Sequence, residues 1–242
     1  MSQNIKNRYA LITGASSGIG QAIAMQLSLE GWKIINFDRQ PPEHQIGQYI
    51  KVDVSDKDEL AHALALVACN PNLIGLVNNV GLVRPASLDT TKLDDFDYHM
   101  AINARASLQC VQALLANMRH MRFGRIVNIT SRAALGKELR SAYAASKGAL
   151  TSMTRTWALE LGADQITVNA VAPGPIGTAA FKIANPPGSP LTRRIIDSVP
   201  LRHIGEPQDV AKAVSFFMRE ETKFITGQTL NVCGGITVGL SP

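Results

Sequence analysis

A glycine-rich turn near the start of the chain constrains the fold more than any other segment. It covers residues 13–20 with the sequence Thr-Gly-Ala-Ser-Ser-Gly-Ile-Gly, and it follows the short apolar run Tyr9–Thr13. Apolar residues then recur every four positions from Ile19 to Leu27, and Gly31 suits the left-handed conformation that ends many helices. This order of strand, turn and helix points free N–H groups and the positive end of a helix dipole at the turn. Such a turn is typical of a pyrophosphate-binding site.

The next apolar run, Lys33–Phe37, ends at an acidic residue, Asp38. An acid at the end of this second strand can hydrogen-bond both hydroxyls of an adenine ribose, which favours a dinucleotide as the ligand. Asp38 would repel a ribose 2′-phosphate, and Ser17 stands where a basic residue could have bound one. We therefore expect NAD(H) rather than NADP(H). Arg39 keeps NADP(H) as the alternative, because a guanidinium can bind a phosphate through two hydrogen bonds.

A third short strand is predicted within Tyr49–Val54, and it ends at Asp53. Two interpretations of this carboxylate remain open. It can meet the adenine edge of the ligand, or it can simply flank the helix that is expected to begin near Asp56.

Tyr143 and Lys147 lie four residues apart in the predicted helix Ala142–Leu161, so their side chains share one helix face. A phenol ionises near pH 10 in water, but a nearby positive charge favours the anion and lowers the pKa. We therefore expect Tyr143 to exchange protons with an alcohol or a carbonyl near neutral pH.

Apolar runs alternate between strand-like and helix-like segments along the chain. Such alternation predicts an α/β fold, a doubly wound parallel sheet covered by helices on both faces, with its ligand crevice at the carboxyl ends of the strands. With 242 residues, 45% of them hydrophobic, the chain can bury a sizeable core as one domain over residues 1–242. The later runs are Leu73–Val77, Leu108–Met121, Arg125–Ile129, Ala142–Leu161, Ile166–Val171 and Gln228–Val232.

The composition excludes several other classes of protein. Cys69, Cys110 and Cys233 are too few and too scattered for a disulfide framework or a zinc site. The net charge of +5 comes from dispersed Lys and Arg residues, and only 5% of residues are aromatic, which argues against nucleic acid as a partner. No stretch approaches the roughly 18 apolar residues of a membrane span, and the N-terminus lacks an apolar signal region. We expect a cytoplasmic protein without a metal site.

The order of these motifs resembles the short-chain dehydrogenase/reductase family over nearly the whole chain. The turn Thr13-Gly14-x3-Gly18-x-Gly20 is similar to its cofactor loop, Asn78-Asn79-Val80-Gly81 to its fourth-strand motif, and Tyr143-x3-Lys147 to its catalytic pair. The resemblance implies a Rossmann domain with a mainly seven-stranded parallel sheet. It also implies a catalytic set of Asn103, Ser131, Tyr143 and Lys147. The implied cofactor-binding set is Gly14, Ser16, Ser17, Gly18, Ile19, Gly20, Asp38, Asp53, Val54, Asn79, Gly81, Tyr143, Lys147, Pro173, Gly174, Ile176 and Thr178.

The resemblance further implies a role for each catalytic side chain. Ser131 and Tyr143 hydrogen-bond the substrate oxygen, Lys147 holds the ribose and lowers the pKa of Tyr143, and Asn103 supports a water relay. The expected activity is hydride transfer between NAD(H) and a secondary alcohol or its ketone, with Tyr143 as the general acid/base. A homotetramer is expected on the same grounds.

Three departures from the family pattern are visible. Val80 stands where Ala is usual, and Cys233 stands where Asp is common. Ser131 precedes Tyr143 by one residue fewer than usual, so strict counting selects Thr130 as the alternative hydroxyl. Ser131 is preferred because the strand Arg125–Ile129 fixes the register independently.

Substrate identity is the least constrained property. The resemblance implies that the Pro- and Gly-rich segment Thr178–Pro200, which follows the sixth strand, forms a mobile lid over the substrate. Cations in this and neighbouring loops either bind an anionic group or, as we favour, face solvent. They are Lys182, Arg193, Arg194, Arg84, Lys137 and Arg140.

Two other functions remain open. One is a 3-oxoacyl thioester reductase, for which Arg119, Arg122 and Arg125 can contact an acidic carrier protein. The other is a catalytically silent dinucleotide-binding sensor or scaffold.

Overall fold

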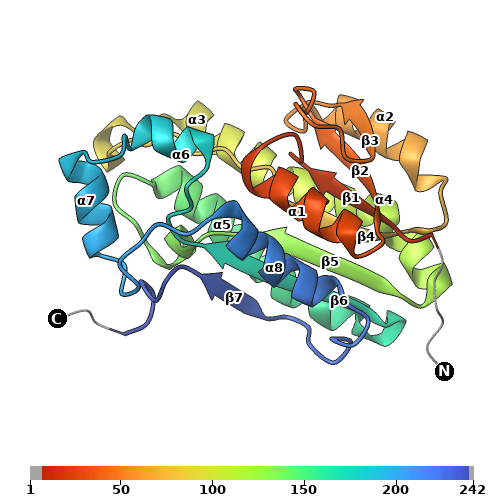
Figure 1. Ribbon diagram of the computed structural model, residues 1–242. Coiled ribbons are helices and arrows are strands. Elements are labelled where there is room, and N and C mark those ends of the chain that lie inside the picture. The colour runs from red at the N-terminus through yellow and green to blue at the C-terminus, as the bar shows by residue number, and fades with distance from the viewer. Residues whose placement is uncertain (1–6, 240–242) are drawn as a thin grey trace.

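A seven-stranded parallel sheet forms the centre of the computed structural model, which describes residues 7–239 (Figure 1). The strand order is β3-β2-β1-β4-β5-β6-β7, and every neighbouring pair is parallel. The predicted doubly wound α/β fold is therefore confirmed. The strands are β1 (Tyr9–Thr13), β2 (Lys33–Asp38), β3 (Gln48–Lys51), β4 (Leu73–Asn78), β5 (Gly124–Ile129), β6 (Ile166–Pro173) and β7 (Thr229–Val232).

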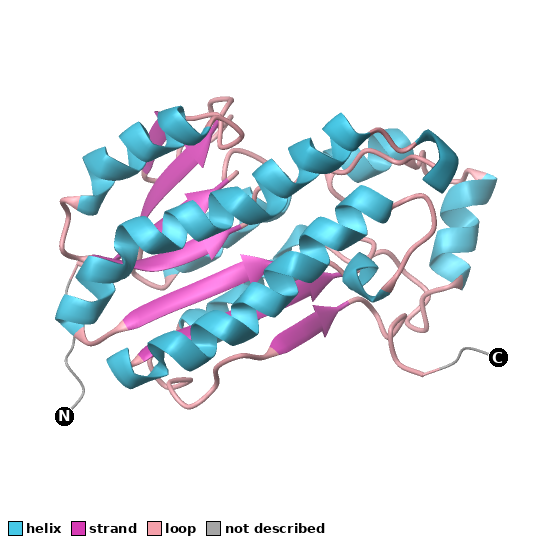
Figure 2. Ribbon diagram, turned by 180° about the vertical axis from the view of Figure 1, so that it is seen from behind, coloured by secondary structure: helices cyan, strands magenta, loops and turns pink. Residues whose placement is uncertain are grey.

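Helices cover both faces of this sheet. Figures 1 and 2, which view the molecule from opposite sides, show α1 and α8 on one face and α2, α4 and α5 on the other. Two apolar clusters fill the spaces between the helices and the sheet, one on each face. The helices are α1 (Gly18–Leu29), α2 (Lys57–Ala68), α3 (Leu93–Met100), α4 (Ala106–Met121), α5 (Ser141–Leu161), α6 (Ala179–Ala184), α7 (Pro190–Asp197) and α8 (Pro207–Met218).

The central strands are buried along their whole length. Every residue of β4, β5 and β6 is buried, as expected for parallel strands that helices cover on both faces. This explains why their sequences are nearly continuous apolar runs and why their bounds were predicted closely.

Among the strands, β3 differs most from the bounds predicted from the sequence. It ends at Lys51, not at Asp53 as the sequence indicated. The reason is local: the Asp53 carboxylate accepts hydrogen bonds from the backbone N–H and the hydroxyl of Ser55, which turns the chain out of the sheet. Asp56 then caps α2 by accepting from the N–H groups of the first helical turn.

The strand order reverses between β1 and β4, which lie side by side although β2 and β3 separate them in sequence. A crevice at the carboxyl ends of such strands is the usual ligand site of this architecture. In Figure 1, α3, α6 and α7 lie beyond these ends. Within residues 7–239, no helix is long and apolar enough to cross a membrane.

Candidate active site

The glycine turn joins β1 to α1 in a conformation that demands glycine. Gly14 and Gly18 have φ angles of +72° and +54°, in the left-handed region that side chains disfavour. At Gly20 a Cβ atom would collide with the Gly14 carbonyl oxygen, and it would lie 2.5 Å from Asn79 Nδ2. The turn therefore folds back closely on itself at the carboxyl edge of the sheet.

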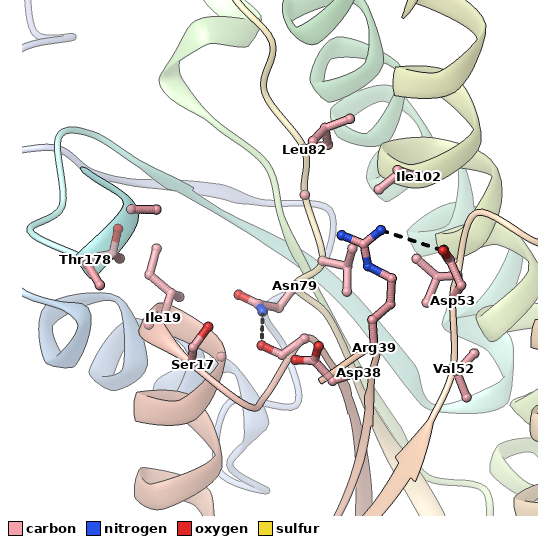
Figure 3. Close-up of a pocket in the computed structure, with 18 of the residues that line it drawn as sticks. Ser17, Ile19, Asp38, Arg39, Val52, Asp53, Asn79, Leu82, Ile102 and Thr178 are labelled. Carbon is pink, nitrogen blue, oxygen red and sulfur yellow. Dashed lines mark hydrogen bonds and ion pairs between the residues drawn. The ribbon is translucent and has the colours of Figure 1, made fainter. Parts of the chain in front are cut away.

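This turn opens into a cavity of about 460 Å³. Ser17 is the N-cap of α1, and its side chain makes no capping hydrogen bond, so N–H groups of the first turn are left free toward the cavity. Figure 3 shows Ser17 and Ile19 on one side of this space and Asp53 on the other. The predicted cofactor residues that line it are Gly14, Ser17, Gly18, Ile19, Gly20, Asp38, Asp53, Val54, Asn79, Gly81 and Thr178.

Six predicted cofactor residues do not line this cavity, and two of them, Tyr143 and Lys147, are described below. The Ser16 hydroxyl is turned inward, where it donates to the Gln40 carbonyl oxygen at 2.6 Å. Ile176 is buried and pairs with Gly205 in an isolated bridge. The remaining two, Pro173 and Gly174, lie at the end of β6, where Gly174 packs closely against Cys233.

Two asparagines hold the glycine turn in place. Asn79, at the end of β4, donates from Nδ2 to the carbonyl oxygens of Thr13 and Gly14 at 2.9 and 3.0 Å, and Figure 3 marks the second bond. Buried Asn36 accepts from the N–H of Ala15 at 3.0 Å. The sequence prediction did not include Asn36, although a single amide in the apolar strand β2 was the available signal. A buried amide needs such partners.

The Asp38 carboxylate lies at the carboxyl end of β2 and is bonded to the backbone on both sides. It accepts from the N–H of Ser16 at 3.1 Å and from the N–H of Gln40 at 3.2 Å. Beside it, the Arg39 guanidinium reaches across the cavity to Asp53, with 3.6 Å between Nη1 and Oδ2 (Figure 3). The Asp53 carboxylate thus has a second partner besides Ser55, and these hydrogen bonds and the Arg39 charge hold its pKa below the ordinary value although burial opposes them.

Ser131 and Thr130 differ clearly in their surroundings. Thr130 is buried, and its hydroxyl donates to the Val171 carbonyl oxygen at 3.2 Å. The Ser131 hydroxyl accepts from the N–H of Ala133 at 3.1 Å, and it lies near the phenol of Tyr143, where it acts to lower the pKa of that phenol. Of the two candidate hydroxyls, the structure therefore brings Ser131 to Tyr143.

The pKa of Tyr143 departs from our expectation. Burial raises it above the ordinary value, while the nearby Ser131 hydroxyl and the charge of Arg140 act in the opposite direction. The expected lowering by Lys147 is not found. Placing the phenol in a half-buried position disfavours its anion more strongly than the neighbouring charges favour it.

Lys147 is buried, one helical turn after Tyr143 on the same face of α5. Its Nζ donates to the Ile129 carbonyl oxygen at 2.7 Å, and burial lowers its pKa to about 8. A Cβ atom on Gly81 would lie 3.2 Å from this nitrogen. Lys147 thus connects the end of β5 to the part of the cavity wall that follows β4.

Asn103 lies in a π-helical turn (Ala101–Arg105) between α3 and α4. Its amide accepts from the N–H of Leu82 at 2.8 Å and donates to the Leu82 carbonyl oxygen at 3.0 Å and to Ser146 Oγ at 2.9 Å. With all these bonds inside the protein, the side chain braces the loop after β4. A π-helical turn is frequent at functional sites.

Comparisons with known proteins agree with this arrangement. A family model described as enoyl-(acyl carrier protein) reductase matches residues 14–237. A 3-oxoacyl-[acyl-carrier-protein] reductase of Staphylococcus epidermidis is 33% identical over 244 residues, covering 95% of this chain and 99% of that protein. The chain belongs to the short-chain dehydrogenase/reductase family. It is therefore an oxidoreductase that uses a nicotinamide dinucleotide.

Solved structures of short-chain dehydrogenases/reductases share the fold. The aldohexose dehydrogenase of Thermoplasma acidophilum is 28% identical, with a TM-score of 0.91 and coverage of 98% of this chain and 96% of that one. A protein of Agrobacterium tumefaciens described as a 2-deoxy-d-gluconate 3-dehydrogenase, solved with bound NADP, is also 28% identical. Its TM-score is 0.89, with coverage of 97% and 98%.

Proposed function

We propose that this enzyme transfers a hydride between NAD(H) and a secondary alcohol or its ketone, with Tyr143 as the general acid/base. The observation that carries the proposal is the meeting of Ser131, Tyr143 and Lys147 at the carboxyl ends of the strands. There the Ser131 hydroxyl lies near the phenol, and the Lys147 ammonium lies beside Gly81, which lines the dinucleotide cavity.

A bound nicotinamide would supply or accept the hydride. Side chains of the protein would donate or accept the proton. In reduction, the Tyr143 hydroxyl donates its proton to the carbonyl oxygen, and in oxidation the phenolate takes it from the alcohol. The Ser131 hydroxyl lies beside the phenol and holds the same oxygen. Lys147 places a positive charge below the reacting groups, which favours the phenolate once the pocket excludes water.

The preference for NAD(H) over NADP(H) rests on Asp38. Two backbone N–H groups fix this carboxylate at the cavity wall, where a ribose 2′-phosphate would face a like charge. Arg39 is 63% exposed and paired with Asp53, and it would have to leave that partner to bind a phosphate. NADP(H) remains the alternative cofactor, because the similar Agrobacterium tumefaciens protein was solved with bound NADP.

The test is a spectrophotometric screen of alcohols and ketones with NAD(H) and NADP(H) in parallel. We expect turnover of at least one secondary alcohol or ketone, with a higher kcat/KM for NAD(H). The matched control is Tyr143→Phe, which keeps the ring and removes the proton donor, so turnover should fall by about 10²- to 10⁴-fold while NADH still binds. Cofactor binding without turnover of any substrate would instead favour the sensor or scaffold.

A 3-oxoacyl thioester reductase is the second candidate, because the Staphylococcus epidermidis relative carries that activity in its name. The surface that was predicted to contact an acidic carrier protein for this activity includes one wrong residue, Arg125. Arg125 is 1% exposed, and its guanidinium donates to the Arg219 carbonyl oxygen at 3.0 Å, so it cannot meet a partner. Arg119 and Arg122 both pair with Asp164. Acetoacetyl thioesters in the same screen separate the two candidates.

A homotetramer is proposed through the long helices α4 and α5. Both carry apolar side chains that face outward: Leu108 is 36% exposed and Leu159 is 86% exposed. Light scattering on the purified protein tests this, and a Leu159→Glu variant should shift the mass toward smaller species if α5 is buried in the assembly.

A further inference from the structure

His99 is a buried histidine that the catalytic set does not include. It lies in α3, one helical turn before Asn103, and its side chain has no exposed surface. Its Nε2 accepts from the backbone N–H of Arg84 at 3.1 Å, and its Nδ1 lies 2.6 Å from the carbonyl oxygen of Asp95. A backbone N–H can only donate and a carbonyl oxygen can only accept. The ring is therefore neutral, with its proton on Nδ1.

His99 and Asn103 hold the same loop. Asn103 binds both the N–H and the carbonyl oxygen of Leu82, and His99 binds the N–H of Arg84. Two side chains from successive helical turns thus fix three backbone groups that follow β4. Leu82 and Arg84 line the dinucleotide cavity, as does Gly81, so these bonds set the position of its wall.

The same ring also contacts the catalytic phenol. The ring centroids of His99 and Tyr143 are 6.5 Å apart, and the ring planes meet at 70°, an edge-to-face arrangement. Tyr143 therefore has the Ser131 hydroxyl near its phenol and the His99 ring edge-to-face with its own ring.

We propose that His99 is a positioning residue, which fixes the Leu82–Arg84 wall of the cavity and the ring of Tyr143 in one arrangement. It acts through these groups, since its two ring nitrogens are both used inside the protein. The part that concerns Tyr143 rests on the function proposed above. The part that concerns the cavity wall rests on cofactor binding alone.

Three variants separate the contributions of the ring. His99→Gln keeps a hydrogen-bond acceptor about as far from the backbone as Nε2 of the histidine, so the Arg84 N–H stays bonded. His99→Phe keeps the ring beside Tyr143 but has no acceptor. His99→Asn lacks the ring, and its shorter amide cannot reach the Arg84 N–H.

The readouts are the hydrogen exchange of the Arg84 amide, the dissociation constant of NADH, and kcat. His99→Gln should retain protection of the amide and a near-wild-type dissociation constant. In His99→Phe that protection should be lost and NADH should bind about tenfold more weakly, with a smaller change in kcat. His99→Asn should lose both affinity and turnover, by about tenfold to hundredfold in kcat/KM, because small misplacements near reacting groups are costly.

Asn117→Ala is the control for simple destabilisation. The Asn117 amide donates to the carbonyl oxygens of Ala68 and Asn70 at 2.9 Å each, at the opposite edge of the sheet. This variant should lower the melting temperature without changing NADH affinity or kcat.

Two results would overturn the proposal: NADH affinity as weak in His99→Gln as in His99→Phe, or wild-type affinity and turnover in both His99→Phe and His99→Asn. If the wild-type enzyme reduces no carbonyl compound, the proposed function fails. The exchange and NADH measurements then still decide the role of His99.

Discussion

Burial raises the pKa of the Tyr143 phenol, and the Arg140 guanidinium, three residues earlier at the N-terminus of α5, opposes that rise. Arg140 donates from Nη1 to the Leu139 carbonyl oxygen at 2.9 Å, and Ala86 donates its N–H to the same oxygen at 3.1 Å. The loop that carries this charge is therefore tied to the loop after β4, and the charge stays near the phenol.

Removing the Arg140 charge should raise the pKa of Tyr143 further. Alcohol oxidation needs the phenolate, so the activity should rise with pH through that pKa. In Arg140→Gln the midpoint of this rise should move to higher pH. The measurement is kcat/KM for oxidation from about pH 8 to about pH 11.5, a range that spans the ordinary phenol pKa of about 10 and values above it. Arg155→Gln, which removes an exposed cation from the same helix, is the matched control and should leave the midpoint unchanged.

Lys147 should make the stability of the wild-type protein depend on pH. Its pKa is about 8 in the folded protein, against an ordinary value of 10.5. Between these values the unfolded chain binds a proton that the folded protein does not, so folding stability rises with pH. Relative to Lys147→Met, the wild type should gain about 3 kcal/mol from pH 8 to pH 10.5. Urea unfolding of both proteins across this range measures the gain. If the free energies of unfolding of the two proteins changed with pH in the same way, the lowered pKa of Lys147 would be contradicted.

The two cofactors should differ in their response to Asp38→Ala. Removing this carboxylate removes the like charge that a 2′-phosphate meets, so the NADPH dissociation constant should fall and that of NADH should rise. In Arg39→Ala the dissociation constant of NADH should change little, because Arg39 pairs with Asp53 and not with Asp38. Calorimetry with each cofactor measures these constants. A wild-type protein that binds NADPH more tightly than NADH would contradict the preference.

The segment Thr178–Pro200 is proposed as the lid. Its two helices bury little: α6 has no buried residue, and α7 has only Thr192. Elements with so few buried contacts open easily, so their amides should exchange quickly without ligand. Because Thr178 lies against Gly18 at the cavity, bound NADH should slow that exchange. The amides of the buried strand β6 serve as the slowly exchanging reference. If the amides of Thr178–Pro200 exchanged equally fast with and without NADH and substrate, the segment would be a fixed wall of the site and not a lid.

The sequence predicted the elements that have a clear hydrophobic period. The runs that became β4, β5 and β6 are buried on both faces, so their apolar residues are continuous and easy to locate. The glycine turn was equally accessible, because its positive φ angles require a residue type that is visible in the sequence.

Properties that depend on three-dimensional surroundings were not accessible in this way. The sequence placed a cation near Tyr143 but could not show that burial outweighs it. Arg125 looked like a surface residue, yet its place in the fully buried strand β5 puts the guanidinium inside the protein. His99 gave no signal, since its partners lie on a loop 15 residues away and on a helix more than 40 residues later.

The identity of the catalytic hydroxyl gives the last prediction. The Ser131 hydroxyl lies near the phenol of Tyr143, whereas the Thr130 hydroxyl donates to the Val171 carbonyl oxygen inside the protein. Ser131→Ala should therefore lose most of kcat while NADH affinity is unchanged. Thr130→Val should keep kcat and lose only about 1 kcal/mol of stability, the usual worth of one internal hydrogen bond.

Steady-state kinetics and urea unfolding of the two variants test this assignment. The backbone N–H of Thr130 still donates to Val171 at 2.9 Å, so Thr130→Val leaves that carbonyl oxygen with a partner. This makes it a fair control for Ser131→Ala. If Thr130→Val lost turnover and Ser131→Ala kept it, the hydroxyl that holds the substrate would be Thr130, and the chain would have to move at the end of β5 to bring it to Tyr143.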